Sequence, residues 1–393
     1  MKDNIGIHAS KLAKLKLARD LKKTLKACER HLDSVTGDED IMDVISKVEE
    51  PILDATGDIY KGSSKQTELI GQDIDDYVQY LIDNPSDFAG IPSGFSRFDV
   101  AIGGGLRRKC VDLVAARPKV GKSMFGDAVA MHVSSELNIP VLVLDTEMSK
   151  KDHHNRMLAC LSGVEINNIT TGKFAESEID KEKVLAARDK LKEIPYHYIS
   201  IAGESFENIL SQMRKWIYQH VGFDDNGQTK DCLIVYDYLK LMGSEGISSS
   251  MQEYQVLGFQ ITKLHNFMVK YDAPCLAFVQ LNRDGITKES TDVVSGSDRL
   301  IWLCTSFSIF KLKSDEEVAD DGADYGNRKL VPVVARHGEG LGDGDYISMK
   351  MFGKYGRIDE GMTRNEIHVE NRSRNEGFEI DEDVNEESDI SDM

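Results

Sequence analysis

The stretch VDLVAARPKVGKS, residues 111–123, decides the fold of this chain. Its first six residues are mostly apolar, which is typical of a strand buried on both faces of a sheet. Its last eight residues match the AxxxxGKS form of a phosphate-binding loop, namely Ala116, Arg117, Pro118, Lys119, Val120, Gly121, Lys122 and Ser123. Backbone N–H groups of such a loop hold phosphate oxygens at a helix N-terminus, while the lysine reaches the β- and γ-phosphates and the hydroxyl binds Mg²⁺. Because a helical pattern begins where the loop ends, the order strand, loop, helix predicts a nucleotide site.

Short apolar runs alternate with amphipathic segments on both sides of this stretch. Fully apolar strands that alternate with helices predict an α/β fold with a mostly parallel sheet covered on both faces. The closer spacing of the later runs favours antiparallel pairs at one edge of the sheet. Helical stripes lie within 206–217 and 257–268. The further predicted strands are 140–145, 232–237, 274–280, 300–313 and 330–336.

Polar side chains stand at the ends of three of these predicted strands. Asp237 closes the run LIVYD and suits the metal site of a P-loop enzyme. Glu147 follows the run PVLVLD and suits the group that activates water, and Asp145 is a rival for the same task. Gln280 ends the next strand, where an amide can contact the γ-phosphate. Acidic and amide side chains are common at strand ends, so these assignments depend on the phosphate-binding loop beside them.

Arg336 ends the last predicted strand, ahead of the glycine-rich HGEGLGDG. An arginine in this place is either a surface residue or a finger that reaches the nucleotide of a neighbouring subunit. Its position in the sequence does not choose between the two.

The chain divides into four predicted regions. Leucines at helical spacing in 8–33 and a second periodic stretch at 39–50 predict a helical hairpin, and an apolar stripe predicts a short helix over 67–82. The tail from 366 is acidic and poor in apolar residues, which predicts disorder. We therefore expect a hairpin at 1–56, a linker with a short helix at 57–85, the ATPase domain at 86–365 and a disordered tail at 366–393.

The net charge of −19 is a poor guide to the partners of the core. About half of the excess lies in the last residues, which carry no Lys or Arg from residue 376 onward. The acidic residues there are Glu376, Glu379, Asp381, Glu382, Asp383, Glu386, Glu387, Asp389 and Asp392.

Composition and the N-terminus argue against a membrane or secreted protein. No window approaches the roughly 18 uninterrupted apolar residues of a membrane span, and the N-terminus lacks the apolar core of a signal peptide. The six cysteines are scattered singly, so neither structural zinc nor a disulfide framework is indicated. We therefore expect a cytoplasmic protein with reduced, mostly buried thiols.

Taken together, the motifs resemble those of the DnaB-like family of hexameric replicative helicases. The resemblance covers about residues 86–360 and implies a RecA-like ATPase domain that assembles into a ring, with nucleotide between subunits and single-stranded DNA in the central channel. The motifs that carry it are GIPSGFS (90–96), AARPKVGKS (115–123), EMSKKDHHNRML (147–158) with TTGKF (170–174), VYDYLKLM (235–242) and VQLNR (279–283).

The resemblance assigns a role to each matching residue. It implies that Lys122 and Ser123 bind phosphate and Mg²⁺, and that Asp237 is the second residue of the metal site. By the same match, Glu147 is the catalytic base, Gln280 senses the γ-phosphate and Arg336 is the arginine finger. The family usually has a lysine two residues before the finger, and Val334 stands there in this chain.

The implied ligands and partners follow from the same family. They are ATP, Mg²⁺, single-stranded and forked duplex DNA, further copies of the chain in a homo-hexamer, and primase and a helicase loader, with no membrane. The loops 243–252 and 282–299 are either plain flexible segments or DNA-gripping loops. In the second interpretation Arg283, Lys288 and Arg299 contact phosphates without reading bases. The basic N-terminal helix is either a solvated face or a further DNA contact.

The N-terminal part of the chain departs from the family pattern. The globular helical bundle expected ahead of the hairpin and linker helix does not precede them, which suggests a short version of the phage or plasmid type. Two rival functions share the same core: a RecA- or RadA-like recombinase, and a regulatory RecA-like ATPase without unwinding activity. Unwinding of a forked duplex, strand invasion and DNA-stimulated ATP turnover distinguish the three.

Overall fold

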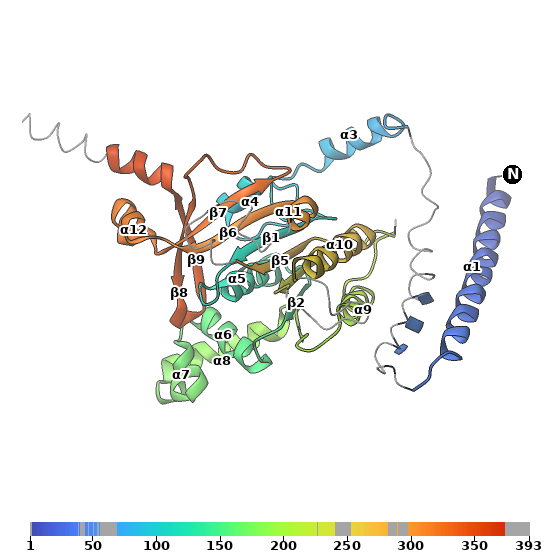
Figure 1. Ribbon diagram of the computed structural model, residues 1–393, viewed down its shortest axis with the longest axis horizontal. Helices are drawn as coiled ribbons and strands as arrows, with labels where there is room; N and C mark the ends of the chain where they lie inside the picture. The colour runs from blue at the N-terminus through green and yellow to red at the C-terminus, as the bar shows by residue number, and fades with distance from the viewer. Residues whose placement is uncertain are drawn as a thin grey trace, which may run out of the picture.

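The computed structural model describes residues 2–37, 39, 44–45, 47–49, 51–52, 55, 69–225, 227–239, 253–281, 289 and 298–373. Its centre is a nine-stranded sheet with the strand order β3-β2-β4-β5-β1-β6-β7-β8-β9 (Figure 1). The strands are β1 (Val111–Ala116), β2 (Val141–Asp145), β3 (Tyr196–Ser200), β4 (Leu233–Asp237), β5 (Cys275–Gln280), β6 (Ser306–Leu312), β7 (Arg328–Ala335), β8 (Ile347–Phe352) and β9 (Arg357–Thr363).

Helices flank this sheet and also precede it along the chain. They are α1 (Lys2–Leu32), α3 (Ile74–Asp83), α4 (Ser96–Ile102), α5 (Lys122–Ser135), α6 (Lys150–Ser162), α7 (Ile166–Thr171), α8 (Glu178–Glu193), α9 (Phe206–Trp216), α10 (Glu253–Tyr271), α11 (Asp298–Leu303) and α12 (Asp315–Asp321). A last helix runs over 364–373. Short 3-10 turns lie at Lys173–Glu176, Ala323–Tyr325 and Gly353–Tyr355, and a π-helical turn extends α9 over Ile217–Val221.

Alternate side chains of the central strands enter two different cores, which makes the domain a three-layer sandwich. On one face, residues such as Leu113 of β1 pack against α9 and α10. On the other face, residues such as Val114 of β1 pack against α4 and α5. Because both faces are covered, β1, β2 and β4 are buried along their whole length. The predicted mostly parallel α/β sheet is therefore present.

The register of the parallel strands brings their carboxyl ends to one edge. Ala116, the last residue of β1, lies opposite Gln280 of β5. Asp145, the last residue of β2, lies opposite Asp237 of β4. All of the strand ends that the sequence singled out for nucleotide chemistry therefore lie along this edge, apart from the one that leads to Arg336.

The last strands form the predicted antiparallel edge. β7 runs against β6, β8 against β7 and β9 against β8. Because β7 is reversed, its carboxyl end lies beside the start of β6, where Ala335 pairs with Ser306. The residue after β7 is thus placed at the edge of the sheet opposite to the phosphate-binding loop.

Two predicted elements are wrong in extent. The apolar run 300–313 was expected to be one strand, but it contains the end of α11 and then β6. An apolar run that is buried throughout has the same pattern in a helix as in a strand, so periodicity could not separate them. The helix expected over 67–82 begins only at Ile74, since Gly71 and the turn at 70–73 precede it. Residues 67–68 lie outside the described part of the chain.

The predicted tail begins too early. Residues 364–373 are helical, and Ile367 is fully buried in this helix. Its carboxylates have specific partners, because Glu366 pairs with Arg97 at 2.7 Å and Glu370 accepts a hydrogen bond from Tyr325 at 2.9 Å. Two carboxylates at the start of the predicted tail thus hold this helix against the domain. The remaining tail residues lie outside the described part.

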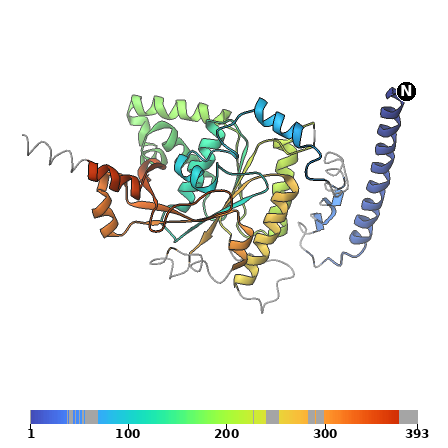
Figure 2. The ribbon, with the colours of Figure 1, turned by 90° about the horizontal axis from the view of Figure 1, so that it is seen from above.

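The first helix, α1, lies apart from the sheet. In both views α1 stands clear of the sheet-containing body (Figures 1 and 2). Cys28 of α1 donates a hydrogen bond to the carbonyl of Val48, within a second helical stretch that covers the described residues between 44 and 55. This pairing agrees with the predicted hairpin, although α1 starts earlier than expected. No described helix is long and apolar enough to cross a membrane.

Candidate nucleotide site

The phosphate-binding loop is held open by its backbone conformation. Lys119 and Gly121 both have positive φ, at 66° and 120°. Residues with a side chain rarely adopt the φ of Gly121, and a Cβ atom there would stand 2.6 Å from the Met351 sulfur, so glycine is favoured at this position. The Arg328 guanidinium donates to the Val120 carbonyl at 2.7 Å and supports the loop from β7. The loop then enters α5 at Lys122, which aims the helix N-terminus at the cleft.

A buried ion pair crosses the base of the site. The Lys122 Nζ lies 2.7 Å from Asp237 Oδ1 and 3.4 Å from the centroid of the Tyr238 ring. Burial raises the pKa of Asp237 and lowers the pKa of Lys122, and the attraction between the two charges opposes both shifts. The nearby Ser123 hydroxyl also lowers the pKa of Asp237. The loop lysine, the loop hydroxyl and the strand-end carboxylate therefore meet at one point, as the sequence predicted.

Glu147 lies on a short loop between β2 and α6, and the nearby Asp145 is buried with hydrogen bonds to both of its carboxylate oxygens. Asp145 is 1% exposed, and one of its oxygens accepts the backbone N–H groups of Glu147 at 2.6 Å and Met148 at 2.8 Å. Glu147 itself is exposed and accepts a hydrogen bond from the Tyr238 hydroxyl. The geometry therefore favours Glu147 over Asp145 as the residue that can act on a bound molecule.

These residues surround an open cleft of about 430 Å³. Among the eight loop residues only Val120 is absent from its lining, because the Val120 side chain is buried in the core. Asp237 lies behind Lys122 rather than on the wall. The lining comprises Ala116, Arg117, Pro118, Lys119, Gly121, Lys122, Ser123, Met124, Glu147, Met148, Arg156, Tyr238 and Gln280.

The oxygen donors at the base of the cleft fit a magnesium ion. A hydroxyl and a carboxylate, from Ser123 and Asp237, lie near each other. Mg²⁺ commonly takes one or two protein oxygens and completes its shell with phosphate and water. The carboxylate already faces a cationic group, the Lys122 ammonium, at 2.7 Å.

Arg336 is the one catalytic candidate that lies elsewhere. Its backbone N–H bonds to the carbonyl of Thr305, and the Thr305 N–H bonds to the carbonyl of Val111 at the start of β1. Its exposed side chain contacts the carbonyl of Trp302. β1 has six residues, and a strand rises about 3.3 Å per residue, so Arg336 and the loop after β1 lie at edges roughly 17 Å or more apart. Arg336 does not belong to the cleft of its own chain.

The structure describes Val334, which stands where the family has a lysine, but it does not describe the side chains of the candidate DNA contacts. Arg283 and Lys288 lie outside the described residues, and only the backbone of Arg299, in α11, is described. Val334 is partly buried against the core between the sheet and α10, so an apolar side chain occupies the place of the family's lysine.

Sequence reasoning assigned no role to three residues of the site. Tyr238 and Arg156 line the cleft, and His153 is buried behind Glu147. Arg156 and His153 fall inside the block EMSKKDHHNRML, so the sequence signal was present, but no role was assigned to them.

The cysteines agree with the expected buried thiols. Five of the six are buried, and Cys160 is half-buried.

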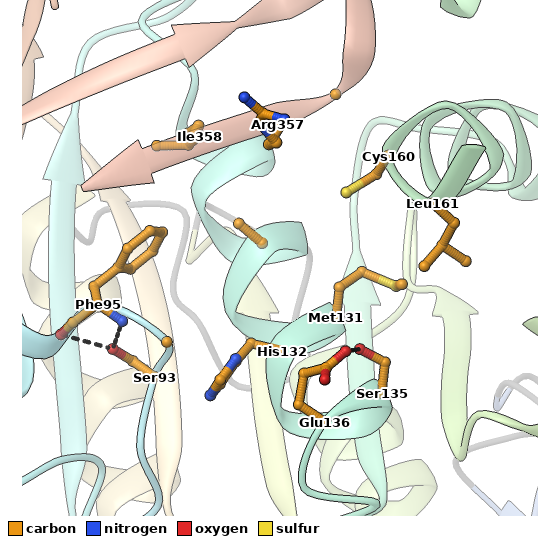
Figure 3. Close-up of a pocket in the computed structure, with 13 residues that line it drawn as sticks. Ser93, Phe95, Met131, His132, Ser135, Glu136, Cys160, Leu161, Arg357 and Ile358 are labelled. Carbon is orange, nitrogen blue, oxygen red and sulfur yellow. Dashed lines mark hydrogen bonds between the residues drawn. The ribbon is translucent and has the colours of Figure 1, made fainter. Parts of the chain in front are cut away.

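A second cavity of about 240 Å³ lies along the C-terminal half of α5 (Figure 3). Its walls are Met131 and His132 of α5, the end of α6 near Cys160, and Arg357 and Ile358 at the start of β9 (Figure 3). None of the residues predicted for the nucleotide site lines it. The two cavities are therefore separate features of the domain.

Comparison with protein families and with known sequences finds similarity to DnaB-like helicases. The model of the DnaB-like helicase C terminal domain matches residues 90–294. The replicative DNA helicase DnaB of Synechocystis sp. is 30% identical over 195 residues, which are 49% of this chain and 21% of that protein. The replicative DNA helicase DnaC of Bacillus subtilis is 24% identical over 280 residues, which are 71% of this chain and 58% of that protein. The chain thus spans less than two thirds of the length of these relatives.

Comparison with solved structures gives the same fold. One solved ATPase domain superposes with a TM-score of 0.65 at 19% identity, over 76% of this chain and 100% of that domain. A DnaB-like replicative helicase, described with its interactions with primase, superposes with a TM-score of 0.62 at 17% identity, over 91% of this chain and 80% of that one. These likenesses confirm the predicted RecA-like α/β core preceded by helices.

Proposed function

Because this chain belongs to the family of DnaB-like helicases, we propose that it is an ATP-dependent replicative DNA helicase that forms a ring and moves along single-stranded DNA. The observation that carries the proposal is the cleft at the carboxyl edge of the sheet. There the phosphate-binding loop, Asp237, Glu147 and Gln280 converge from four different segments of the chain.

The proposed chemistry starts with phosphate binding. The backbone N–H groups of the loop and the N-terminus of α5 receive the phosphates, and Lys122 moves from Asp237 toward the β- and γ-phosphates. Ser123 and Asp237 are the residues that would hold Mg²⁺, and the ion would neutralise charge on the phosphate oxygens when it is bound. Movement of Lys122 away from Asp237 would leave this carboxylate free for that role.

Glu147 is the proposed general base for the attacking water. It is exposed at the rim of the cleft, whereas Asp145 has both oxygens engaged and does not line the cleft. Burial and the neighbouring Glu147 carboxylate raise the pKa of Tyr238, so the tyrosine hydroxyl stays protonated and can orient Glu147. Gln280, opposite Ala116, is placed to contact the γ-phosphate from β5.

Arg336 supports the assembly of several copies. It lies at the opposite edge of the sheet from its own loop, so it can meet a nucleotide only in the cleft of another copy. An arginine finger supplied in this way stabilises charge on the transferred phosphoryl group. Since each copy then offers a cleft at one edge and a finger at the other, we propose a closed ring, as a homo-hexamer.

The proposed partners follow from this activity. Single-stranded DNA and the forked duplex are the substrates of the motor, and Arg283, Lys288 and Arg299 remain the predicted phosphate contacts in the channel. Primase and a helicase loader are the proposed protein partners, by analogy with the relative whose structure was described with primase. The N-terminal helices are the segment that we propose to receive them.

One experiment tests the function directly. ATP hydrolysis is measured with and without single-stranded DNA. The same preparation is assayed for unwinding of a forked duplex, and its particle mass is measured with nucleotide bound. We expect DNA-stimulated turnover, ATP-dependent unwinding and a hexameric mass. Strand exchange without unwinding would indicate a recombinase instead, and turnover that ignores DNA would indicate a regulatory ATPase.

A further inference from the structure

His153 is a buried imidazole between two buried aspartates. It lies in the first turn of α6 and is 2% exposed. Its Nε2 lies 2.8 Å from Asp145 Oδ2, and its Nδ1 lies 3.4 Å from Asp127 Oδ1. Burial alone lowers the pKa of His153, but the hydrogen bonds and charges of Asp127 and Asp145 outweigh it and raise this pKa to about 9. The ring therefore carries a proton on both nitrogens at neutral pH.

Asp145 connects this imidazolium to the loop of the proposed base. While its Oδ2 contacts His153, its Oδ1 accepts the N–H groups of Glu147 and Met148. The Asp145 carboxylate is held in one orientation when both of its oxygens have partners. Oδ1 has the loop N–H groups as partners, and Oδ2 has His153.

Other groups hold the same loop and the same ring. The Tyr198 hydroxyl donates to the Met148 carbonyl at 2.6 Å, and the Tyr198 ring lies 4.6 Å from the His153 ring. Thr146 donates its N–H to the Asp237 carbonyl at 3.0 Å, which joins the loop to the end of β4. With the loop held in this way, Glu147 and Met148 line the cleft, and Glu147 is the acidic residue of the two.

The other side of His153 also leads to the cleft. Asp127 forms an ion pair with Arg156, which lines the cleft, and it accepts a hydrogen bond from the Tyr196 hydroxyl at 3.3 Å. The charged and titratable groups around the His153 ring are thus Asp145 of β2, Asp127 of α5, Asp152 and Arg156 of α6, and the tyrosines of β3.

We propose that His153 is a positioning residue for Glu147. Its two-sided contact fixes Asp145, and Asp145 in turn fixes the backbone of the loop that aims Glu147 into the cleft. The inference rests on the proposed function, in which Glu147 acts on the attacking water. Preorganisation of this kind matters because a misplacement of about 1 Å can lower a rate about a hundredfold.

Two substitutions of similar size separate the two sides of the ring. In His153→Gln the side-chain amide nitrogen can take the place of Nε2 and keep the contact with Asp145. In His153→Asn the shorter amide can take the place of Nδ1, and the contact with Asp145 is lost. We expect His153→Gln to keep kcat within about threefold of wild type and His153→Asn to lose about tenfold or more. KM for ATP should stay within about twofold in both, because the phosphate-binding loop is untouched.

A double-mutant cycle tests whether His153 acts through Glu147. In a Glu147→Gln background, single-turnover hydrolysis at high enzyme concentration should show no further loss from His153→Asn, since the group being positioned is already disabled. A further loss of similar size to that in the wild-type background would overturn the proposal.

Binding and stability measurements distinguish a failure of the positioning role from a failure of the proposed function. Affinity for a fluorescent ATP analogue and the thermal unfolding temperature are recorded for each variant. A wild-type protein that binds the analogue but never hydrolyses ATP would refute the proposed function itself. Hydrolysis by the wild type with equal kcat values in both His153 variants would refute only the positioning role. Equal losses in both, including failure of both to fold, would assign His153 to packing and also overturn it.

Discussion

The Lys122 ammonium and the Asp237 carboxylate lie 2.7 Å apart and form a buried ion pair across the floor of the nucleotide cleft. The lysine that we propose to bind phosphate is therefore also the partner of the carboxylate that we propose for the metal site. Any change at Lys122 affects two charges at once, which makes its effect on stability as informative as its effect on turnover.

Lys122→Ala should abolish ATP turnover and lower stability modestly. The variant loses the charge that faces the β- and γ-phosphates and leaves Asp237 without its cation. Because burial raises the pKa of Asp237, this carboxyl can take up a proton, and a loss of about 1–3 kcal/mol in the free energy of unfolding is expected. Phosphate release and chemical denaturation check both parts, with the surface variant Lys192→Ala as control. Hydrolysis above about a tenth of wild type would contradict the assigned loop.

Glu147→Gln and Asp145→Asn should fail in different ways. Glu147→Gln keeps the shape of the side chain but cannot accept a proton, so nucleotide should still bind while hydrolysis is lost. Asp145→Asn should lower the unfolding temperature, because it weakens the contact with His153, and should reduce hydrolysis less. Analogue binding, turnover and thermal unfolding are compared for the two. If Asp145→Asn is the more damaging to turnover while it remains folded, the base is wrongly assigned.

Arg336→Ala should bind ATP almost normally and hydrolyse it about a thousandfold more slowly, as is found when a P-loop enzyme lacks its finger. Mixing it with Lys122→Ala subunits should restore part of the activity. A cleft from the first variant and a finger from the second then form one complete site.

The control for mixing is a preparation of wild-type and Lys122→Ala subunits. It shows whether an intact site still hydrolyses ATP when the neighbouring sites in the ring are inactive. Exchange of subunits is verified by pull-down of tagged chains. If exchange occurs, isolated sites work and activity still does not return, then Arg336 acts within its own chain or has no role in hydrolysis.

Removal of residues 1–84 should leave a folded ATPase that assembles poorly. α3 has no buried residue, and Ile74, Val78 and Leu81 remain 46–48% exposed, which is unfavourable unless another copy covers them. Val78→Asp should weaken assembly in the full chain, whereas Gln79→Glu beside it should not. Particle mass by light scattering with nucleotide bound is the measurement. A stable ring from the truncated protein would rule out this role of α3.

The stability contributed by His153 should depend on pH. Its pKa is raised from 6.5 to about 9 in the folded protein, so the contribution is fully present below pH 6.5 and is lost as pH rises through about 9. The difference in free energy of unfolding between wild type and His153→Gln should therefore shrink across this window, by up to a few kcal/mol. Denaturation at pH 6 and at pH 9.5 measures it. A difference that is constant with pH would mean that His153 is neutral in the folded protein.

Local pattern was sufficient for the strands that are buried along their length. β1, β2, β4 and β5 were all predicted from apolar runs, and the loop after β1 was recognised from eight consecutive residues. β3 was missed, because its side chains are only partly buried and its sequence YHYIS has no apolar run. β8 and β9 were missed for a related reason, since the second half of β8 and most of the edge strand β9 are only partly buried and carry mixed side chains.

Local pattern was enough to predict the strand, the loop and the helix of the candidate phosphate site, and to single out the polar residues at the strand ends. These features depend on neighbours along the chain, where pattern and composition are informative. The contact between Asp145 and His153, and the position of Arg336 at the edge of the sheet opposite to Lys122, became known only from the fold. These relationships depend on strand order and strand direction, which are set by contacts between segments far apart in the sequence, and no local pattern encodes such contacts.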